Sequence, residues 1–81
     1  MLKRISDVQP LDNYCLLLTF NDEEKRVYDM ASWLDKPYFQ PLKEISFFRN
    51  VWVNPITRTV EWEGERDLCP DMLYEDSQPV S

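Results

Sequence analysis

The stretch from Trp62 to Tyr74 carries nearly every local signal of a strand followed by a short helix. Pro70 stands at the first helical position, where its missing N–H removes no hydrogen bond. Asp71 falls in the first turn, where the helix dipole stabilises a carboxylate. Leu68 and Leu73 have the N′-to-N4 spacing of a hydrophobic staple. The stretch therefore predicts a short helix whose start is fixed by its own sequence.

The chain uses the same device in an earlier stretch. Asp29 is a good N-cap for a short helix over Met30–Leu34, and Tyr28 and Trp33 have the same staple spacing. Before the later helix, Asp67 is placed to accept a hydrogen bond from the backbone N–H two residues on, as Asx turns do. The residues of this structural signature are Asp29, Trp33, Trp62, Asp67, Leu68, Pro70, Asp71, Leu73 and Tyr74.

Alternating apolar residues predict the strands of the chain. Tyr14–Phe20 is the clearest strand, because both of its faces are largely apolar, which is typical of a central strand. Arg4–Gln9 precedes it, and Lys25–Tyr28 returns from an acidic turn to complete a first hairpin. Val51–Val53 and Thr59–Trp62 form a second hairpin.

Residues 35–50 are expected to be irregular, because Pro37 and Pro41 interrupt any long helix. A short helical turn over Leu42–Ile45 is the one regular element that we predict there. The segment is nevertheless rich in Tyr, Phe, Leu and Ile, which makes it too apolar for a linker. It should therefore pack across one face of the sheet.

These elements predict a small α+β domain. We expect an antiparallel sheet of about five strands, made of two hairpins and an N-terminal strand, with two short helices and an apolar irregular segment packed on it. With 81 residues the chain makes one domain, most of whose apolar residues must serve the core. We assign residues 1–76 to a single compact domain and expect residues 77–81 to form a flexible C-terminal tail.

The net charge of the chain is concentrated at its C-terminal end. The formal net charge is −6, although residues 1–60 hold eight basic and eight acidic residues. From residue 61 onward, Arg66 stands against the acidic residues Glu61, Glu63, Glu65, Asp67, Asp71, Glu75 and Asp76. Such a field repels nucleic acid and anionic membranes and attracts basic partners. The alternative interpretation is a solvated acidic edge that keeps a small protein soluble.

Catalytic and metal-binding chemistry has little support in the sequence. The chain has no His and one Gly, which removes Ser-His and Cys-His catalysis, most zinc sites and glycine-rich phosphate loops. The C-terminal carboxylates could act as general acid and base or hold a divalent cation, but capping and solvent exposure account for them. We therefore predict no enzyme activity, no catalytic or metal-binding residues and no cofactor.

The two cysteines, Cys15 and Cys69, are too few for a disulfide scaffold. The N-terminal residues lack an apolar run long enough for a signal peptide, and no stretch is long enough for a membrane span. We therefore expect two thiols in a cytoplasmic protein, with a single disulfide between them as the alternative.

Most aromatic residues are expected in the core, because large rings fill a small core efficiently. Trp52 is the exception, since it lies between Val51 and Val53 and faces outward if the two valines face the core. An exposed Trp on a sheet is a typical interface anchor, and Arg49 and Arg58 lie near the ends of the same hairpin. If helices and loops cover both faces instead, Trp52 is part of the core.

The order of these motifs resembles the bacterial domain-of-unknown-function family 2442, and the resemblance covers nearly the whole chain. Its most specific part is the ending Asp-Leu-Cys-Pro-Asp-x-Leu-Tyr over residues 67–74, at a fixed spacing from Trp62. Two turns depart from the family pattern. Asp22 is followed by Glu23 where the family has Asp-Gly, and Glu63-Gly64-Glu65-Arg66 stands where the family has Pro-Asn-Gly-Ala.

The resemblance implies a small α+β domain with an antiparallel sheet. Some members of the family are fused to a helix-turn-helix domain, which we do not expect in this chain. Genes of stand-alone members often lie beside genes of small proteins of the domain-of-unknown-function family 4160, an arrangement similar to a toxin–antitoxin pair. The resemblance supplies no catalytic residues to carry over.

We therefore expect a non-enzymatic protein-interaction module, the antitoxin-like or regulatory partner of a small basic protein encoded nearby. The partner-binding residues that we predict are Trp52, Glu61, Glu63, Glu65, Asp67 and Asp71. A domain that binds a small ligand or a divalent cation is the alternative. A homodimer through exposed strand edges is compatible with so small a sheet, whereas direct binding to nucleic acid or to a membrane is not expected.

Overall fold

The fold is built from two antiparallel sheets, which a computed structural model describes over residues 3–64 and 66–80. The first sheet has the order β1-β2-β3-β7 and the second the order β4-β5-β6. The strands are β1 Ile5–Pro10, β2 Cys15–Phe20, β3 Lys25–Asp29, β4 Trp52–Val53, β5 Val60–Trp62, β6 Arg66–Asp67 and β7 Gln78–Pro79. The predicted α+β class and antiparallel pairing are confirmed, with two small sheets in place of one.

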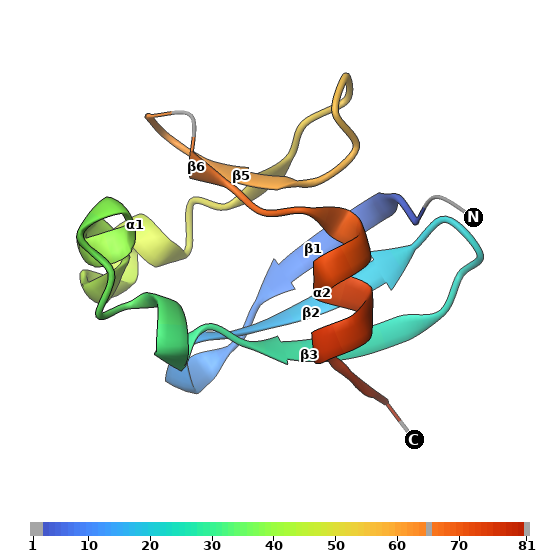
Figure 1. Ribbon diagram of the computed structural model, residues 1–81, viewed down its shortest axis with the longest axis horizontal. Coiled ribbons are helices and arrows are strands. Elements are labelled where there is room, and N and C mark those ends of the chain that lie inside the picture. The colour runs from blue at the N-terminus through green and yellow to red at the C-terminus, as the bar shows by residue number, and fades with distance from the viewer. Residues whose placement is uncertain (1–2, 65, 81) are drawn as a thin grey trace.

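Short helices connect the strands of the two sheets. The helices are α1 Ile45–Phe48 and α2 Pro70–Asp76, with the 3-10 helices η1 Asp12–Tyr14, η2 Ala31–Trp33 and η3 Pro37–Lys43. In Figure 1, α2 lies across one face of β1–β3, the second sheet lies above that face, and α1 closes one end of the molecule. The core therefore lies between the first sheet, the second sheet and α2.

The strand β2 occupies the interior of the first sheet, as its apolar sequence predicts. Leu16, Leu18 and Phe20 are fully buried on its inner face. Leu17 and Thr19 on the other face are half-buried. This strand pairs with β1 on one side and with β3 on the other.

The core joins the two sheets and fixes the start of α2. Trp62 is fully buried, and its indole N–H donates to the carbonyl of Phe48 at 2.9 Å. Leu68 and Leu73 are both buried, at the N′ and N4 positions of a helix whose N-cap is Cys69 and whose first turn holds Pro70. The predicted staple and the predicted place of the proline are confirmed.

The turn between β2 and β3 has the geometry that glycine favours, without a glycine. The amide of Glu23 donates to the carbonyl of Phe20 at 2.8 Å, and the amide of Phe20 donates to the carbonyl of Glu24 at 2.9 Å. This is a three-residue hairpin loop that ends in a left-handed residue, and Glu23 has a φ of 69°. The Glu in place of the family's Gly is therefore held in a conformation that disfavours a side chain.

The predicted helix over Met30–Leu34 is wrong in length. One 3-10 turn, Ala31–Trp33, forms, because Met30 has a ψ of 0° and lies outside the helical region. The chain is extended again at Lys36, with a ψ of 135°, as expected of a residue before proline. The carboxylate of Asp29 accepts a hydrogen bond from the amide of Ala31 at 2.8 Å, one position before the N-cap. Asp29 therefore supports the turn as an Asx-type contact.

Residues 37–48 are more regular than their prolines suggest. Pro37 lies in the first turn of η3, where a proline is tolerated, and Phe39 and Leu42 of the same helix are buried. The predicted turn over Leu42–Ile45 is wrong, because Glu44 is extended and separates η3 from α1. Phe39, Leu42 and Phe48 are buried, so the segment packs against the core as its apolar composition predicts. It lies at one end of the molecule, whereas the prediction placed it across one face of the sheet (Figure 1).

The C-terminal residues differ from the flexible tail that we predict for residues 77–81. Gln78–Pro79 forms β7, which pairs with β3. Ser77 is buried because Arg26 donates to its hydroxyl at 2.7 Å and to its carbonyl at 2.6 Å. This anchor brings the following residues to the edge of β3, while Ser81 lies outside the described residues.

Candidate functional site

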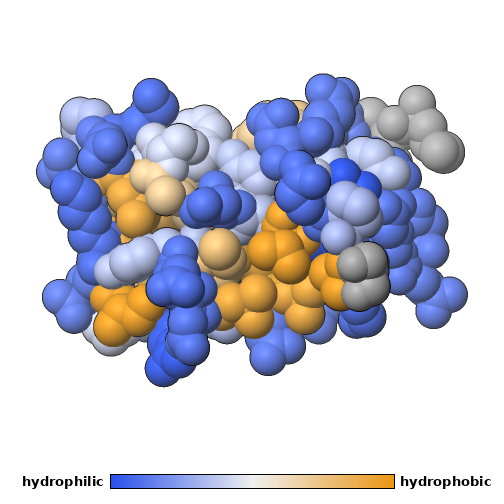
Figure 2. All heavy atoms as spheres, turned by 90° about the horizontal axis from the view of Figure 1, so that it is seen from below, coloured by the Kyte–Doolittle hydropathy of each residue, from blue (hydrophilic) through white to orange (hydrophobic). Residues whose placement is uncertain are grey.

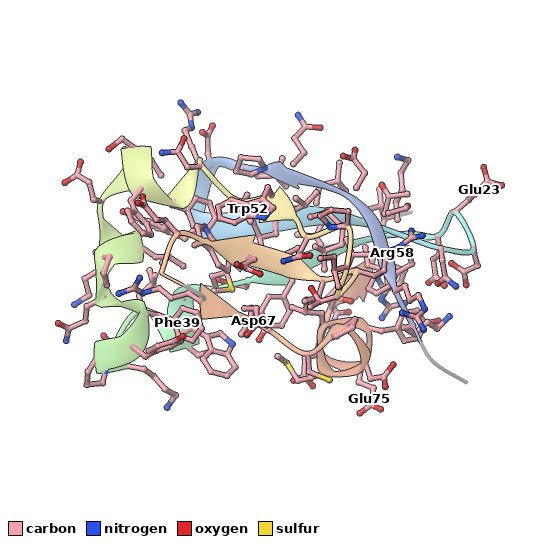
Figure 3. All side chains as sticks on the ribbon, turned by 90° about the horizontal axis from the view of Figure 1, so that it is seen from above. Glu23, Phe39, Trp52, Arg58, Asp67 and Glu75 are labelled. Atoms are coloured by element: carbon pink, nitrogen blue, oxygen red, sulfur yellow. The ribbon has the colours of Figure 1, made fainter. Side chains whose placement is uncertain are left out.

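A row of three side chains crosses the outer face of the second sheet. In the register of the strands, Trp52 pairs with Glu61, and Glu61 pairs with Asp67. Cross-strand partners of this kind point to the same side of a sheet, with Cβ atoms about 5 Å apart. Figure 3 looks onto this sheet from above and labels Trp52 and Asp67 on it. The structure thus brings together three of the six predicted partner-binding residues in what we call the Trp52 row.

Trp52 is exposed, which decides between the two predicted alternatives for it. Its side of the sheet is open, and 41% of the residue is accessible to solvent. Val51 and Val53 are half-buried and pack against the core. The alternation of the strand therefore places the valines inward and the indole outward.

Glu61 is held in place by the turn of its own hairpin. The side-chain amide of Asn54 donates to one carboxylate oxygen of Glu61 at 3.0 Å. The oxygen of the same Asn54 amide accepts the N–H of Ile56 at 2.8 Å and that of Thr57 at 3.3 Å. Asn54 is therefore fixed by the turn, and within the described residues it is the one hydrogen-bond partner of the half-buried Glu61 side chain.

No basic side chain of the described residues neutralises the two carboxylates of the row. Within residues 3–64 and 66–80, the ion pairs are Lys3–Asp22, Arg26–Glu24 and Arg49–Asp12. Arg66 is the neighbour of Asp67 in sequence, but its side chain points to the other side of the sheet. It donates to the carbonyls of Tyr38 and Glu63, both at 2.7 Å.

Two further predicted partner-binding residues, Glu63 and Asp71, lie outside the Trp52 row. Glu63 is exposed just beyond the end of β5. Glu65 lies outside the described residues. Asp71 belongs to the fold, because its carboxylate accepts the backbone N–H of Lys3 at 2.9 Å and so ties the N-terminus to α2.

Asp67 does not make the predicted Asx contact. Among the described residues, no hydrogen bond joins its carboxylate to the amide of Cys69, and the residue is exposed in β6. Pairing with Glu61 places Asp67 in an extended strand, so its side chain points away from the start of α2. The carboxylate is thereby available on the outer face.

A second group of charges surrounds Tyr74 in α2, and the sequence analysis missed all of its members except Tyr74. The ammonium of Lys3 lies 4.0 Å and the guanidinium of Arg26 lies 4.4 Å from the centre of the Tyr74 ring. Lys3 pairs with Asp22 at 3.0 Å, and Arg26 pairs with Glu24 at 2.7 Å. The Tyr74 hydroxyl donates to Glu24 at 3.0 Å. We call this group the Tyr74 cluster.

The contacts of the Tyr74 cluster shift the titration of its members. The hydrogen bond from Lys3 lowers the pKa of Asp22, and the same bond raises the pKa of Lys3. The hydrogen bond from Arg26 lowers the pKa of Glu24. Each shift favours the charged form, so the cluster is neutralised internally.

The described residues offer no enclosed site for a ligand or a metal. Residues 3–64 and 66–80 contain no pocket and no group of three His, Cys, Asp or Glu residues arranged to hold a metal ion. Cys15 and Cys69 are unpaired thiols, as predicted, and burial raises the pKa of Cys15. No helix in this part of the chain is long and apolar enough to cross a membrane.

The outer face of the first sheet is a further surface. Figure 2 shows the underside of the molecule, where apolar side chains gather beside the C-terminal end. Leu17 and Val27 lie opposite each other on the outer face of this sheet and are half-buried. Half-buried aliphatic residues are ordinary on the solvent side of an antiparallel sheet, so we assign no site there.

Comparisons with known proteins agree with the fold. The sequence matches, over residues 5–79, the family described as Protein of unknown function (DUF2442). The structure is similar to the crystal structure of Putative DNA Binding Protein NE0471 from Nitrosomonas europaea ATCC 19718, with a TM-score of 0.84 and 22% identity. The match covers 95% of this chain and 50% of that chain, so this chain spans half the length of that protein. A search of curated proteins finds no match. The chain belongs to the DUF2442 family of proteins of unknown function.

Proposed function

We propose that this chain is a non-enzymatic protein-interaction domain that binds a basic protein through the outer face of the β4-β5-β6 sheet. The observation that carries the proposal is the Trp52 row, in which an exposed indole stands beside two carboxylates. No basic residue within the described part of the chain pairs with either carboxylate. Exposed Trp residues are frequent anchors of protein interfaces, and complementary charge guides the partner to them.

The pairing of Glu61 with Asp67 supports a role in binding. Like charges directly opposite each other on a sheet destabilise it. Proteins commonly keep such unfavourable groups where they serve function. A basic partner would relieve the repulsion and gain two ion pairs.

The charge of the chain favours a protein partner over DNA. The similar structure from Nitrosomonas europaea carries the name Putative DNA Binding Protein, and this chain corresponds to half of it. A net charge of −6 opposes contact with phosphates. A regulatory role at DNA would therefore run through a fused or separate DNA-binding partner. A small basic protein encoded nearby, as in a toxin–antitoxin pair, fits the charge of the Trp52 row.

The test is a capture experiment with two variants of equal charge. The Glu61→Gln/Asp67→Asn variant removes two charges from the Trp52 row, and the Glu75→Gln/Asp76→Asn variant removes two from exposed positions of α2. We expect the wild type and the α2 variant to capture a small basic protein from an extract of the native host at low salt. The row variant should lose it, and so should the wild type at moderate salt.

Mass spectrometry of the captured material reads the result. Equal capture by both double variants would show that total charge, and not the Trp52 row, determines binding. Absence of any captured protein would contradict the proposed function.

A further inference from the structure

The Tyr74 cluster shows how this fold combines an aromatic ring with charged side chains. Two cations, Lys3 and Arg26, lie over the ring of Tyr74, and each is paired with a carboxylate. The ring attracts the cations through its quadrupole, while the carboxylates fix their positions. A ring and two carboxylates thus form a binding site for basic side chains within the molecule itself.

The Trp52 row contains the same ring-and-carboxylate combination on an open surface. Trp52, Glu61 and Asp67 are successive cross-strand neighbours, and the indole is 41% exposed. We propose that an arginine side chain of the protein partner binds this row. Its guanidinium plane stacks on the Trp52 indole, and its N–H groups bond the neighbouring carboxylates. This proposal rests on the proposed function and names the chemistry of the partner.

The geometry of the row favours arginine over lysine. A guanidinium is planar, so it can stack on an indole while its edges carry five N–H donors toward carboxylates. An ammonium is a compact and strongly hydrated charge, which gains less from a flat ring beside a carboxylate. Trp is also the aromatic side chain with the strongest attraction for cations.

The hairpin turn holds the acceptor of the proposed arginine in place before binding. Asn54 is fixed by hydrogen bonds to Ile56 and Thr57, and it donates to one oxygen of Glu61. A carboxylate oxygen can accept more than one hydrogen bond, so Glu61 remains able to accept from a guanidinium. Restricting Glu61 in advance lowers the entropy lost on binding.

The experiment compares two short basic peptides on the full-length chain. Peptides of equal length, one with four arginines and one with four lysines between glycines, are titrated while the indole N–H resonance of Trp52 is followed by NMR. An exposed cation–π contact supplies a factor of about two to five, and lysine gains only part of it, so we expect the arginine peptide to bind about two-fold more tightly. Trp52→Ala should abolish that preference, read from the amide resonance of Glu61.

Two controls separate this proposal from the proposed function. The Glu61→Gln/Asp67→Asn variant should bind both peptides more weakly, while Glu75→Gln/Asp76→Asn should bind them as the wild type does. Equal affinity of the wild type for both peptides would overturn the arginine proposal, even where the native partner is still captured. A Trp52 resonance that shifts with protein concentration alone would place a second copy of the chain on the row and would also overturn it.

Discussion

The two charged regions of this molecule use the same residue types to opposite effect. In the Tyr74 cluster, both cations are paired with carboxylates and lie over one aromatic ring. In the Trp52 row, two carboxylates face each other across neighbouring strands, and no basic residue of the described chain pairs with them. The first region has its partners within the fold, and the second presents its carboxylates to solvent.

This difference separates residues that hold the fold from residues that can bind. The Tyr74 cluster joins three distant segments, because Lys3 precedes β1, Arg26 lies in β3 and Tyr74 lies in α2. The Trp52 row joins neighbouring strands that already pair through their backbones. Its side chains can therefore be changed with little loss of structure, whereas those of the Tyr74 cluster cannot.

Of the substitutions considered, Tyr74→Ala should lower the stability of the domain most. The Tyr74 ring packs edge-on against the buried Phe20 with centroids 5.2 Å apart, so Tyr74→Ala removes a core contact and both cation–π contacts. We expect a loss of about 3 kcal/mol in the free energy of unfolding, measured by urea denaturation. Trp52→Ala should cost less than about 0.5 kcal/mol, as exposed positions usually do. Similar losses for the two variants would remove the distinction between the regions.

Leu68 connects the two regions, since it lies between β6 and α2. It is 5% exposed, so Leu68→Ala leaves a cavity beneath the start of α2. We expect a loss of about 2 kcal/mol in urea denaturation. Leu68→Met keeps most of the volume and serves as the control, with a smaller loss. An unchanged unfolding midpoint in Leu68→Ala would refute the staple.

A feature of this fold can be predicted from the sequence when the residues that determine it lie close together along the chain. The start of α2 depends on residues within one short stretch, Leu68–Leu73, and it was predicted correctly. Alternation within one strand offers the outward position of Trp52 as one of two alternatives, and its 41% exposure decides between them. In contrast, the Tyr74 cluster depends on contacts such as Tyr74–Glu24, which are 50 residues apart, and no spacing in the sequence indicates them.

Two wrong predictions have the same cause, since tertiary contacts overrode a local preference. Asp67 has the sequence position of an Asx turn, but pairing with Glu61 draws it into β6. The residues after Ser77 have the composition of a tail, but the bonds from Arg26 to Ser77 hold them against β3. The sequence carries the signal for each local preference and none for the contact that prevails.

A substitution at Glu23 should strengthen the hairpin that supplies Asp22 and Glu24 to the Tyr74 cluster. Glu23 has a φ of 69°, which disfavours a side chain, so Glu23→Gly removes strain that exceeds the added freedom of the unfolded chain. We expect a gain of about 0.5–1 kcal/mol in the free energy of unfolding. Glu23→Ala removes the charge but keeps the strained backbone, so it should give little change in the same assay.

Replacing an acidic residue by lysine should raise stability in the Trp52 row and lower it in the Tyr74 cluster. Asp67→Lys converts a like-charge pair with Glu61 into an attractive pair, and we expect a gain of about 0.5 kcal/mol in chemical denaturation. The same variant should lose the basic partner. Asp22→Lys places a like charge beside Lys3 and should lower stability. A loss of stability in Asp67→Lys would indicate that Asp67 has a structural role.

Acid should lower stability only slightly through Asp22 and Glu24. The ion pairs of the Tyr74 cluster lie near the surface, where solvent screens them. The pKa values of Asp22 and Glu24 are lowered from 3.8 and 4.5 by hydrogen bonds from Lys3 and Arg26. Their contribution is therefore complete above those ordinary values and is lost as pH falls through the lowered ones. The pKa of Lys3 is raised from 10.5 by its bond to Asp22, so its contribution is lost only as pH rises beyond that value.

Thermal melts across the acid range should show a shallower loss of stability in Asp22→Asn/Glu24→Gln than in the wild type. The Glu61→Gln/Asp67→Asn variant removes the same number of charges from the Trp52 row. If the acid dependence arises in the Tyr74 cluster, this second variant should keep the slope of the wild type, and an equally shallow slope would assign the effect to net charge.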